Sequence, residues 1–195
     1  MNNLPYFFKH KILLASQSPR RQQILKYSGF DLEIIKIDVE EDFPSNLQAE
    51  EIPLFLAQKK AEAYQLPIQE TEILVTADTV VWLNNQVLNK PQDIEEAQKM
   101  LQQLSGQKHT VYTGVCIKTS QSQHVFFDQS DVYFNILNEA TINYYLEHYK
   151  PLDKAGAYGV QEFIGYVSIR RIEGCYYNIM GFPVAKFIEE IKKIV

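Results

Sequence analysis

The segment "LLASQSPRRQQIL", residues 13–25, joins an apolar strand to a helix and so decides the fold class. The run "KILLA" at 11–15 is short, continuous and apolar, which is typical of a buried strand. Ser18 is suited to cap a helix, Pro19 then stands at its first position, and Gly29 is a stop signal. The segment therefore predicts a strand, a turn of small and polar residues, and a helix that ends at the glycine.

Arg20 and Arg21 stand in the first turn of this predicted helix, where the helix dipole is already positive. Two cations there are mildly unfavourable by themselves, but a bound anion would compensate them. The turn has neither the GxxxxGK[ST] pattern of a P-loop nor the GxGxxG of a dinucleotide site. Two interpretations stay open at this point: a phosphate site of another kind, or an ordinary helix cap with solvated arginines.

Length and charge limit the class of protein. The chain has 195 residues, 46% of them apolar, so it can bury a sizeable core. We expect a single domain over 1–195, built as two intimate lobes. The formal net charge of −5 disfavours a nucleic-acid-binding or anionic-membrane-binding protein, so an anionic ligand would have to be met by a local group of cations.

The distribution of apolar residues and cysteines points to the cytoplasm. The longest apolar runs are strand-sized, and residues 1–10 lack the features of a signal peptide. Cys116 and Cys175 form no CxxC pair, which fits a reducing compartment. The four histidines show no HExxH spacing, so we expect no zinc site.

The remaining elements follow from periodicity and capping signals. We expect strands at 30–38, at 72–83 with an interruption at Asp78-Thr79, at 108–119, at 123–136 and at 166–172. We expect helices at 49–64, from Asp93 to 105, after Asn138, and at the C-terminal end to Val195. The segment "EGCYYNIMGFP" at 173–183 reads as a loop. Hairpins mixed with strand–helix units predict an α/β protein with a mixed sheet.

Asp78 lies in the middle of the apolar run "EILVTADTVVWL". A carboxylate there costs several kcal/mol unless it is paired, hydrogen-bonded or metal-bound. Strand alternation points Asp78 to one side and Ala77 and Thr79 to the other, so the carboxylate can enter a cleft. The alternative is a structural aspartate that accepts a hydrogen bond from a local N–H group.

Other motifs are ordinary when taken singly. The acidic run "VEEDFP" carries Glu41, and Lys60 and Lys90 stand in "AQKKAEAY" and "LNKP". In "DKAGAYGVQ", Gly156 and Gly159 flank a tyrosine, which allows close approach of the backbone to a ligand but also fits a tight turn.

Together these motifs are much more specific. The segments "LLASQSPRRQQIL", "ADTVV", "LNKP", "LSGQKHTVYTGV", "DKAGAYGVQ" and "YYNIMGFP" occur in order, and the chain from 11 to 190 resembles the Maf family of nucleoside triphosphate pyrophosphatases. The resemblance implies an inosine-triphosphatase-like (Maf/Ham1-type) α/β fold: an elongated mixed β-sheet with flanking helices and a deep central cleft.

The resemblance also implies roles for individual residues. Asp78 matches the family's proton acceptor and is the expected catalytic residue. Arg20, Thr79 and Gln161 match three positions that set substrate choice, in the combination that goes with dTTP and UTP and not with 7-methyl-GTP. The softer assignments are phosphate binding by Ser16, Arg21, Lys60, Lys90 and Lys154, and metal binding by Asp78 and Glu41. Gln17 departs from the small residue or glycine that many relatives have in this turn.

The implied chemistry fits these residue types. The cations would clamp the phosphates of a nucleoside triphosphate, while Asp78 with Glu41 would hold Mg²⁺ or Mn²⁺ and activate a water that attacks the α-phosphorus. Pyrophosphate and a nucleoside monophosphate would result. Gln161 can offer both a donor and an acceptor to a pyrimidine, whereas Thr79 has a single hydroxyl.

Two other classes stay open. One is a non-catalytic nucleotide-binding regulator of septum formation and cell division, and the other, which the net charge disfavours, is a nucleic-acid-binding module. The sequence does not select among dTTP, UTP and modified pyrimidine triphosphates, and leaves the oligomeric state open, with a homodimer as one option. By resemblance, the activity would cleanse nucleotide pools of unwanted triphosphates.

Overall fold

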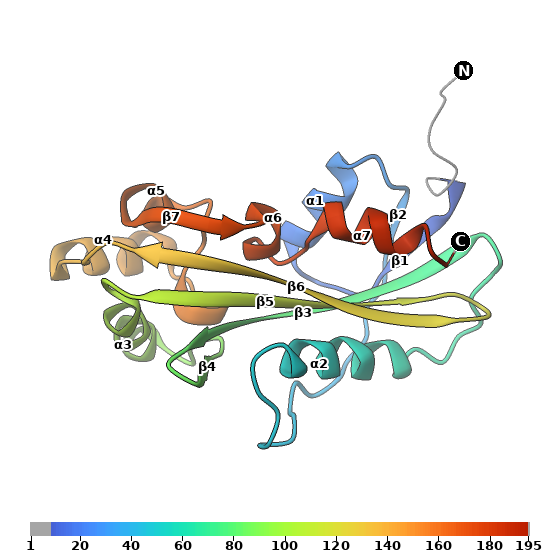
Figure 1. The fold of residues 1–195 in the computed structure, drawn as a ribbon, viewed down its shortest axis with the longest axis horizontal. Helices are drawn as coiled ribbons and strands as arrows, with labels where there is room; N and C mark the ends of the chain where they lie inside the picture. Colours follow the sequence, from blue (N-terminus) through green and yellow to red (C-terminus); the bar gives the residue numbers. More distant parts are fainter. Residues whose placement is uncertain (1–8, 195) are drawn as a thin grey trace.

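A mixed β-sheet of seven strands organises the part of the chain that the computed structural model describes, residues 9–194 (Figure 1). The strand order is β2-β1-β3-β5-β6-β7, and β4 also pairs with β3. The strands are β1 (Lys11–Leu14), β2 (Leu32–Ile34), β3 (Glu72–Leu83), β4 (Gln86–Leu88), β5 (Lys108–Lys118), β6 (Gln123–Phe134) and β7 (Ile169–Gly174).

Helices lie on both faces of this sheet (Figure 1). They are α1 (Pro19–Tyr27), α2 (Glu51–Glu62), α3 (Ile94–Leu104), α4 (Glu139–Tyr149), α5 (Phe163–Ser168), α6 (Tyr176–Ile179) and α7 (Val184–Ile191), with a short 3₁₀ turn, η2 (Ala155–Ala157). β1 is parallel to β2 and β3, and the other pairs are antiparallel, so the predicted mixed α/β sheet is confirmed.

One edge of β3 is open in its middle. β5 pairs with one edge of β3 along residues 74–82, so β1 and β4 share the other edge. On that edge β1 covers residues 72–75 and β4 covers residues 81–83, and no strand of the described chain covers residues 76–80. β1 stops because the Ser-Gln-Ser-Pro turn leads straight into α1. The segment that decides the fold therefore also creates a gap in the sheet.

The predicted caps form. The Ser18 side chain accepts a hydrogen bond from Arg21 N, the Asp93 side chain from Glu96 N, and the Asn138 side chain from Thr141 N. Each cap satisfies a backbone donor at a helix start that would otherwise lack a partner.

Two large apolar clusters lie toward opposite ends of the long strands. One, beneath α1 and α7, contains Val75 and Phe187, and the other, around α3 and α4, contains Val81 and Tyr145. β3 contributes side chains to both clusters. Residues 78–80 of the open edge lie between these two contributions.

Four predictions of elements were wrong, two of them for reasons of strand pairing. The strand expected at 30–38 is regular only over Leu32–Ile34, because it pairs with β1, which is itself only four residues long. The expected interruption at Asp78-Thr79 does not occur, because β5 pairs with β3 through both residues. In the segment predicted as a loop at 173–183, the turn α6 forms over Tyr176–Ile179.

The strand expected at 166–172 begins only at Ile169. Residues 163–168 form α5, in which Ile164 and Ser168 are buried four residues apart, the spacing of one helix face. The pattern of this short segment was therefore interpreted as the two-residue period of a strand, whereas residues 163–168 follow the period of a helix.

Candidate active site

A cleft of about 590 Å³ lies at the open edge of β3. All ten residues proposed from the sequence for catalysis, specificity, phosphate or metal line it: Ser16, Arg20, Arg21, Glu41, Lys60, Asp78, Thr79, Lys90, Lys154 and Gln161. They come from β3, α1, α2, the turn after β1 and the loops before α2, after β4 and after α4. The structure thus brings together residues that are up to 145 positions apart in the sequence, and the role of each stays a prediction.

The cleft wraps around both faces of β3. Asp78 points toward α2, where Lys60 Nζ donates to its Oδ1 at 2.6 Å. Thr79 points the other way, where Arg21 Nη2 donates to its Oγ1 at 3.0 Å. The alternation predicted for these neighbours is therefore present, and a ligand at this edge can contact both faces at once.

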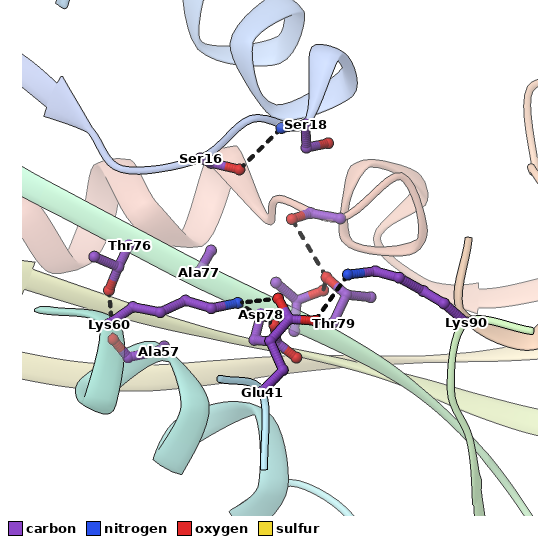
Figure 2. A network of polar contacts seen from close by, with 12 residues as sticks. Ser16, Ser18, Glu41, Ala57, Lys60, Thr76, Ala77, Asp78, Thr79 and Lys90 are labelled. Atoms are coloured by element: carbon purple, nitrogen blue, oxygen red, sulfur yellow. Dashed lines mark hydrogen bonds and ion pairs between the residues drawn. The ribbon is translucent and has the colours of Figure 1, made fainter. Parts of the chain in front are cut away.

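Asp78 and Glu41 share one ammonium group (Figure 2). Lys60 Nζ lies 2.7 Å from Glu41 Oε1 and 2.6 Å from Asp78 Oδ1, and Lys90 Nζ lies 2.8 Å from Glu41 Oε2. Burial by itself would raise the pKa of Glu41, but hydrogen bonds and charge from Lys60 and Lys90 outweigh it and lower that pKa to about 2. Glu41 is therefore ionised at neutral pH.

The donor set suits a divalent cation that also binds phosphate. Both carboxylates contact the same ammonium nitrogen, so both border the place in the cleft where a positive charge lies. Mg²⁺ is usually held by one or two carboxylates together with substrate phosphates and waters. Within residues 9–194 no group of three or more His, Cys, Asp or Glu side chains could hold a metal without such help. The residues present therefore fit a metal that arrives with the substrate.

Arg21 connects three parts of the chain around the cleft. Its Nε donates to Gly181 O at 2.8 Å, its Nη1 to Ala77 O at 2.9 Å, and its Nη2 to Thr79 Oγ1 at 3.0 Å. The acceptor Ala77 O lies in the uncovered stretch of β3, so Arg21 binds the open edge where a strand would otherwise pair. Burial lowers the pKa of Arg21. Its expected role in phosphate binding stays a prediction, and these contacts show that all three of its guanidinium nitrogens already hold protein groups.

Ser16 and Gln161 are polar groups with capacity left for a ligand. Ser16 Oγ accepts from Ser18 N at 3.3 Å and from Arg21 Nη1 at 3.4 Å, so its own hydroxyl proton is available to an anion. Gln161 Oε1 is buried and has no hydrogen-bond partner in the described chain. A buried acceptor without a partner costs about 1–3 kcal/mol, so its position in a cleft indicates a ligand that donates to it.

A family model described as "Maf-like protein" matches residues 11–194. The chain belongs to the Maf family. Curated relatives agree in name and length: a "dTTP/UTP pyrophosphatase" of Bacteroides thetaiotaomicron is 48% identical over 187 residues, covering 95% of this chain and 97% of the relative. One of Porphyromonas gingivalis with the same name is 49% identical over 189 residues, covering 94% of each chain.

The fold of this Maf-family chain has a solved counterpart. The structure of the Staphylococcus aureus Ham1 protein matches with a TM-score of 0.50 at 17% identity, over 92% of this chain and 98% of that one. At this level of identity the likeness concerns the fold alone, and it confirms the expected inosine-triphosphatase-like architecture.

Two acidic residues at this Maf-family cleft were missed from the sequence: Asp153, which lines it, and Glu162, which pairs with a lysine of its lining. Asp153 Oδ2 pairs with Arg20 Nη1 at 2.8 Å, and its Oδ1 with Lys154 Nζ at 2.7 Å. Glu162 Oε1 lies 3.0 Å from the same Lys154 nitrogen, and Glu162 also accepts a hydrogen bond from the Tyr145 hydroxyl. Burial would raise the pKa of Asp153, but Lys154 and Arg20 lower it. The signal was present in "LDKAGAYGVQE", where acids flank the expected cation and amide.

Gln17, the departure from the family pattern, is exposed at the rim of the cleft. Among residues 9–194, every helix is too short or too polar to span a bilayer.

Proposed function

We propose that this Maf-family chain is a nucleoside triphosphate pyrophosphatase that hydrolyses dTTP and UTP to the monophosphate and pyrophosphate. The observation that carries the proposal is the cleft at the open edge of β3, which gathers three carboxylates, five cationic side chains and an unpartnered amide oxygen. The curated relatives, whose printed names state this activity, support it.

The reaction assigned to this cleft is attack of water on the α-phosphorus. The new bond joins the water oxygen to that phosphorus, the bond to the bridging oxygen of the β-phosphate breaks, and Asp78 takes the proton from the water. The lysines and Arg20 hold the negative charge of the phosphates and of the departing pyrophosphate. Arg20 and Lys154 must exchange their contacts with Asp153 for phosphate oxygens when the substrate binds.

We infer a divalent metal requirement from the same geometry. Asp78 and Glu41 would hold Mg²⁺ or Mn²⁺, which supplies charge neutralisation at the phosphates. Lys60 pairs with both of these carboxylates and marks the position between them as one that holds positive charge.

Recognition of the base is assigned to the opposite face of β3. The free oxygen of Gln161 can accept the imide N–H of uracil or thymine, while its amide nitrogen can donate to a ring carbonyl. Arg20 and Thr79 complete the set of residues that we propose to determine substrate choice.

The test is pyrophosphate release from dTTP, UTP, CTP, dCTP, ATP, GTP and 7-methyl-GTP, with Mg²⁺, with Mn²⁺ and with a chelator. We expect dTTP and UTP to lead the panel, and Asp78→Asn to lower kcat by about 10²- to 10⁴-fold, the typical contribution of a positioned general base. Asp128→Asn, on β6 and outside the cleft, is the matched control and should retain activity.

Each remaining outcome has a clear meaning. Activity confined to purine nucleotides would keep the reaction and overturn the specificity assignment. Nucleotide binding without metal-dependent pyrophosphate release would overturn the enzyme and favour the regulator.

A further inference from the structure

A chain of hydroxyl groups runs from the cleft into the core. Thr79 Oγ1 lies 2.9 Å from Thr113 Oγ1, and Thr113 Oγ1 donates to Asn178 O at 3.0 Å. Thr113 is directly opposite Thr79 in the register of β3 and β5, and it has no exposed surface. Thr113 therefore cannot touch a substrate, and its contact with a polar side chain of the cleft lining is the one with Thr79.

The partners at the two ends fix the direction of the hydrogen bonds. Asn178 O can only accept, so the Thr113 hydroxyl donates to it and its oxygen accepts from Thr79. Arg21 Nη2 can only donate, so Thr79 Oγ1 accepts there. The Thr79 hydroxyl proton is thus donated to Thr113. Toward the cleft, Thr79 Oγ1 can only accept a hydrogen bond, through its remaining lone pair.

The inner end of this chain is held firmly. Asn178 is fully buried, and its Nδ2 donates to Val111 O and to Ser130 Oγ, both at 3.0 Å. Another acceptor near the Thr79 hydroxyl, Gly181 O, lies 3.5 Å away, at the limit of a hydrogen bond, and competes weakly.

We propose that Thr113 is a positioning residue for specificity, which fixes the Thr79 hydroxyl as an acceptor toward the cleft. A fixed acceptor beside the Gln161 oxygen favours bases that present a ring N–H group there, as the imide of uracil and thymine does, and the two acceptors then share this single N–H. It disfavours cytosine, whose ring N3 is itself an acceptor, because two acceptors would face each other without a proton. This inference rests on the proposed function of the same cleft.

The test replaces the hydroxyl without changing the size of the side chain. Thr113→Val removes the acceptor for the Thr79 proton, so that hydroxyl can rotate and donate to cytosine. We expect the ratio of kcat/KM for UTP over CTP to fall by about tenfold, which corresponds to one misplaced hydrogen bond. Thr113→Ser restores the hydroxyl and should restore the ratio.

Two controls separate this effect from a general loss of structure. Thr110→Val makes the same change on the same strand outside the cleft, and should leave the ratio unchanged. In a Thr79→Val background, Thr113→Val should have no further effect on the ratio, because the group it positions is gone. If Thr113→Val does not fold, Thr113→Cys, a much weaker acceptor, gives the same comparison.

The outcomes distinguish the two proposals. A wild-type chain without pyrophosphatase activity would overturn the proposed function. An active wild-type chain whose UTP/CTP ratio is the same in folded Thr113→Val, or is changed equally by Thr110→Val, would overturn only the role of Thr113.

Discussion

Glu41 shows how a single side chain in this cleft is tuned by its neighbours. It is partly exposed, yet it contacts two lysines, which hold its pKa at about 2. A carboxylate that stays ionised in this way is ready to accompany Asp78 in binding a cation. Its charge also couples the stability of the fold to pH.

For Glu41→Gln we predict a change in the pH dependence of stability. Since the pKa of Glu41 in the folded chain lies below its ordinary value of 4.5, the ionised form stabilises the fold above pH 4.5, and this contribution is lost as the pH falls toward about 2. The difference in unfolding free energy between wild type and Glu41→Gln should therefore be largest above pH 4.5 and shrink below it, as measured by urea unfolding from pH 3 to 7.

Glu40→Gln is the matched control for this measurement, because Glu40 is the adjacent exposed carboxylate and lies outside the cleft. A difference for Glu41→Gln that does not vary between pH 3 and pH 7 would contradict the assigned ion pairs.

The positions of single residues in the cleft were predictable where strand alternation or a sequence motif applies to them. Alternation placed Asp78 and Thr79 on opposite faces, and all ten residues that the motifs supplied line the cleft. The contacts of Arg21 were not predictable, because two of its acceptors, Ala77 O and Gly181 O, are backbone groups brought together only by the folded chain. Thr113 was missed for a similar reason, since its role depends on register with Thr79.

At the scale of elements, the position of α2 on the sheet decides where Lys60 lies. At Gly114 on β5 the helix and the sheet are in close contact, because a Cβ there would lie 2.3 Å from Pro53 O. Only glycine allows this contact without a shift of the backbone. Gly114 is also paired with Asp78, so the close contact lies beside the carboxylate.

We predict that Gly114→Ala forces α2 away from the sheet. The cost should be roughly 1–3 kcal/mol in unfolding free energy, as for other overpacked sites, measured by urea denaturation. Activity should fall as well, because Lys60 moves with α2. Gly29→Ala, strained by its φ of +87° but free of steric contacts, is the comparison: it should lose stability and keep activity. Full activity in Gly114→Ala would contradict this role for α2.

Helices with a capping residue in the sequence were predicted well. Elements whose length depends on a neighbouring strand, or that are very short, were not. The helices with side-chain caps at Ser18, Asp93 and Asn138 begin where the sequence indicates. β2 is shorter than its apolar alternation suggests because its partner β1 is short, and α5 was missed because a six-residue segment carries too little periodicity to separate helix from strand.

At the scale of the whole molecule, β3 links the two ends. Val75 belongs to the apolar cluster beneath α1 and α7, and Val81 to the cluster around α3 and α4. Loss of either cluster would expose part of the same strand. We therefore propose that residues 1–195 behave as one domain with two lobes.

This proposal predicts one cooperative unfolding transition. Trp82, the single tryptophan, packs beside the cluster under α2, whereas far-UV circular dichroism reports helices at both ends. The two signals should give the same urea midpoint. Separate midpoints would indicate two independently folding lobes.

The global architecture was predictable from hairpins mixed with strand–helix units, and from the family resemblance. The open edge of β3 was not, because it results from the lengths of two partners, β1 and β4, on one side of a strand that looks uniform in sequence.

That open edge has a consequence for solubility. An uncovered stretch of backbone in a sheet can recruit a strand from another chain and so start aggregation. Here the guanidinium of Arg21 donates to the Ala77 carbonyl, and the cleft is lined by charged lysines and carboxylates that an approaching apolar strand would have to remove from water at a high cost in free energy. The same arginine and lysines that make the gap suitable for a nucleotide thus also oppose pairing of this edge with a strand of another chain. The sheet can therefore stay incomplete at this edge without promoting aggregation.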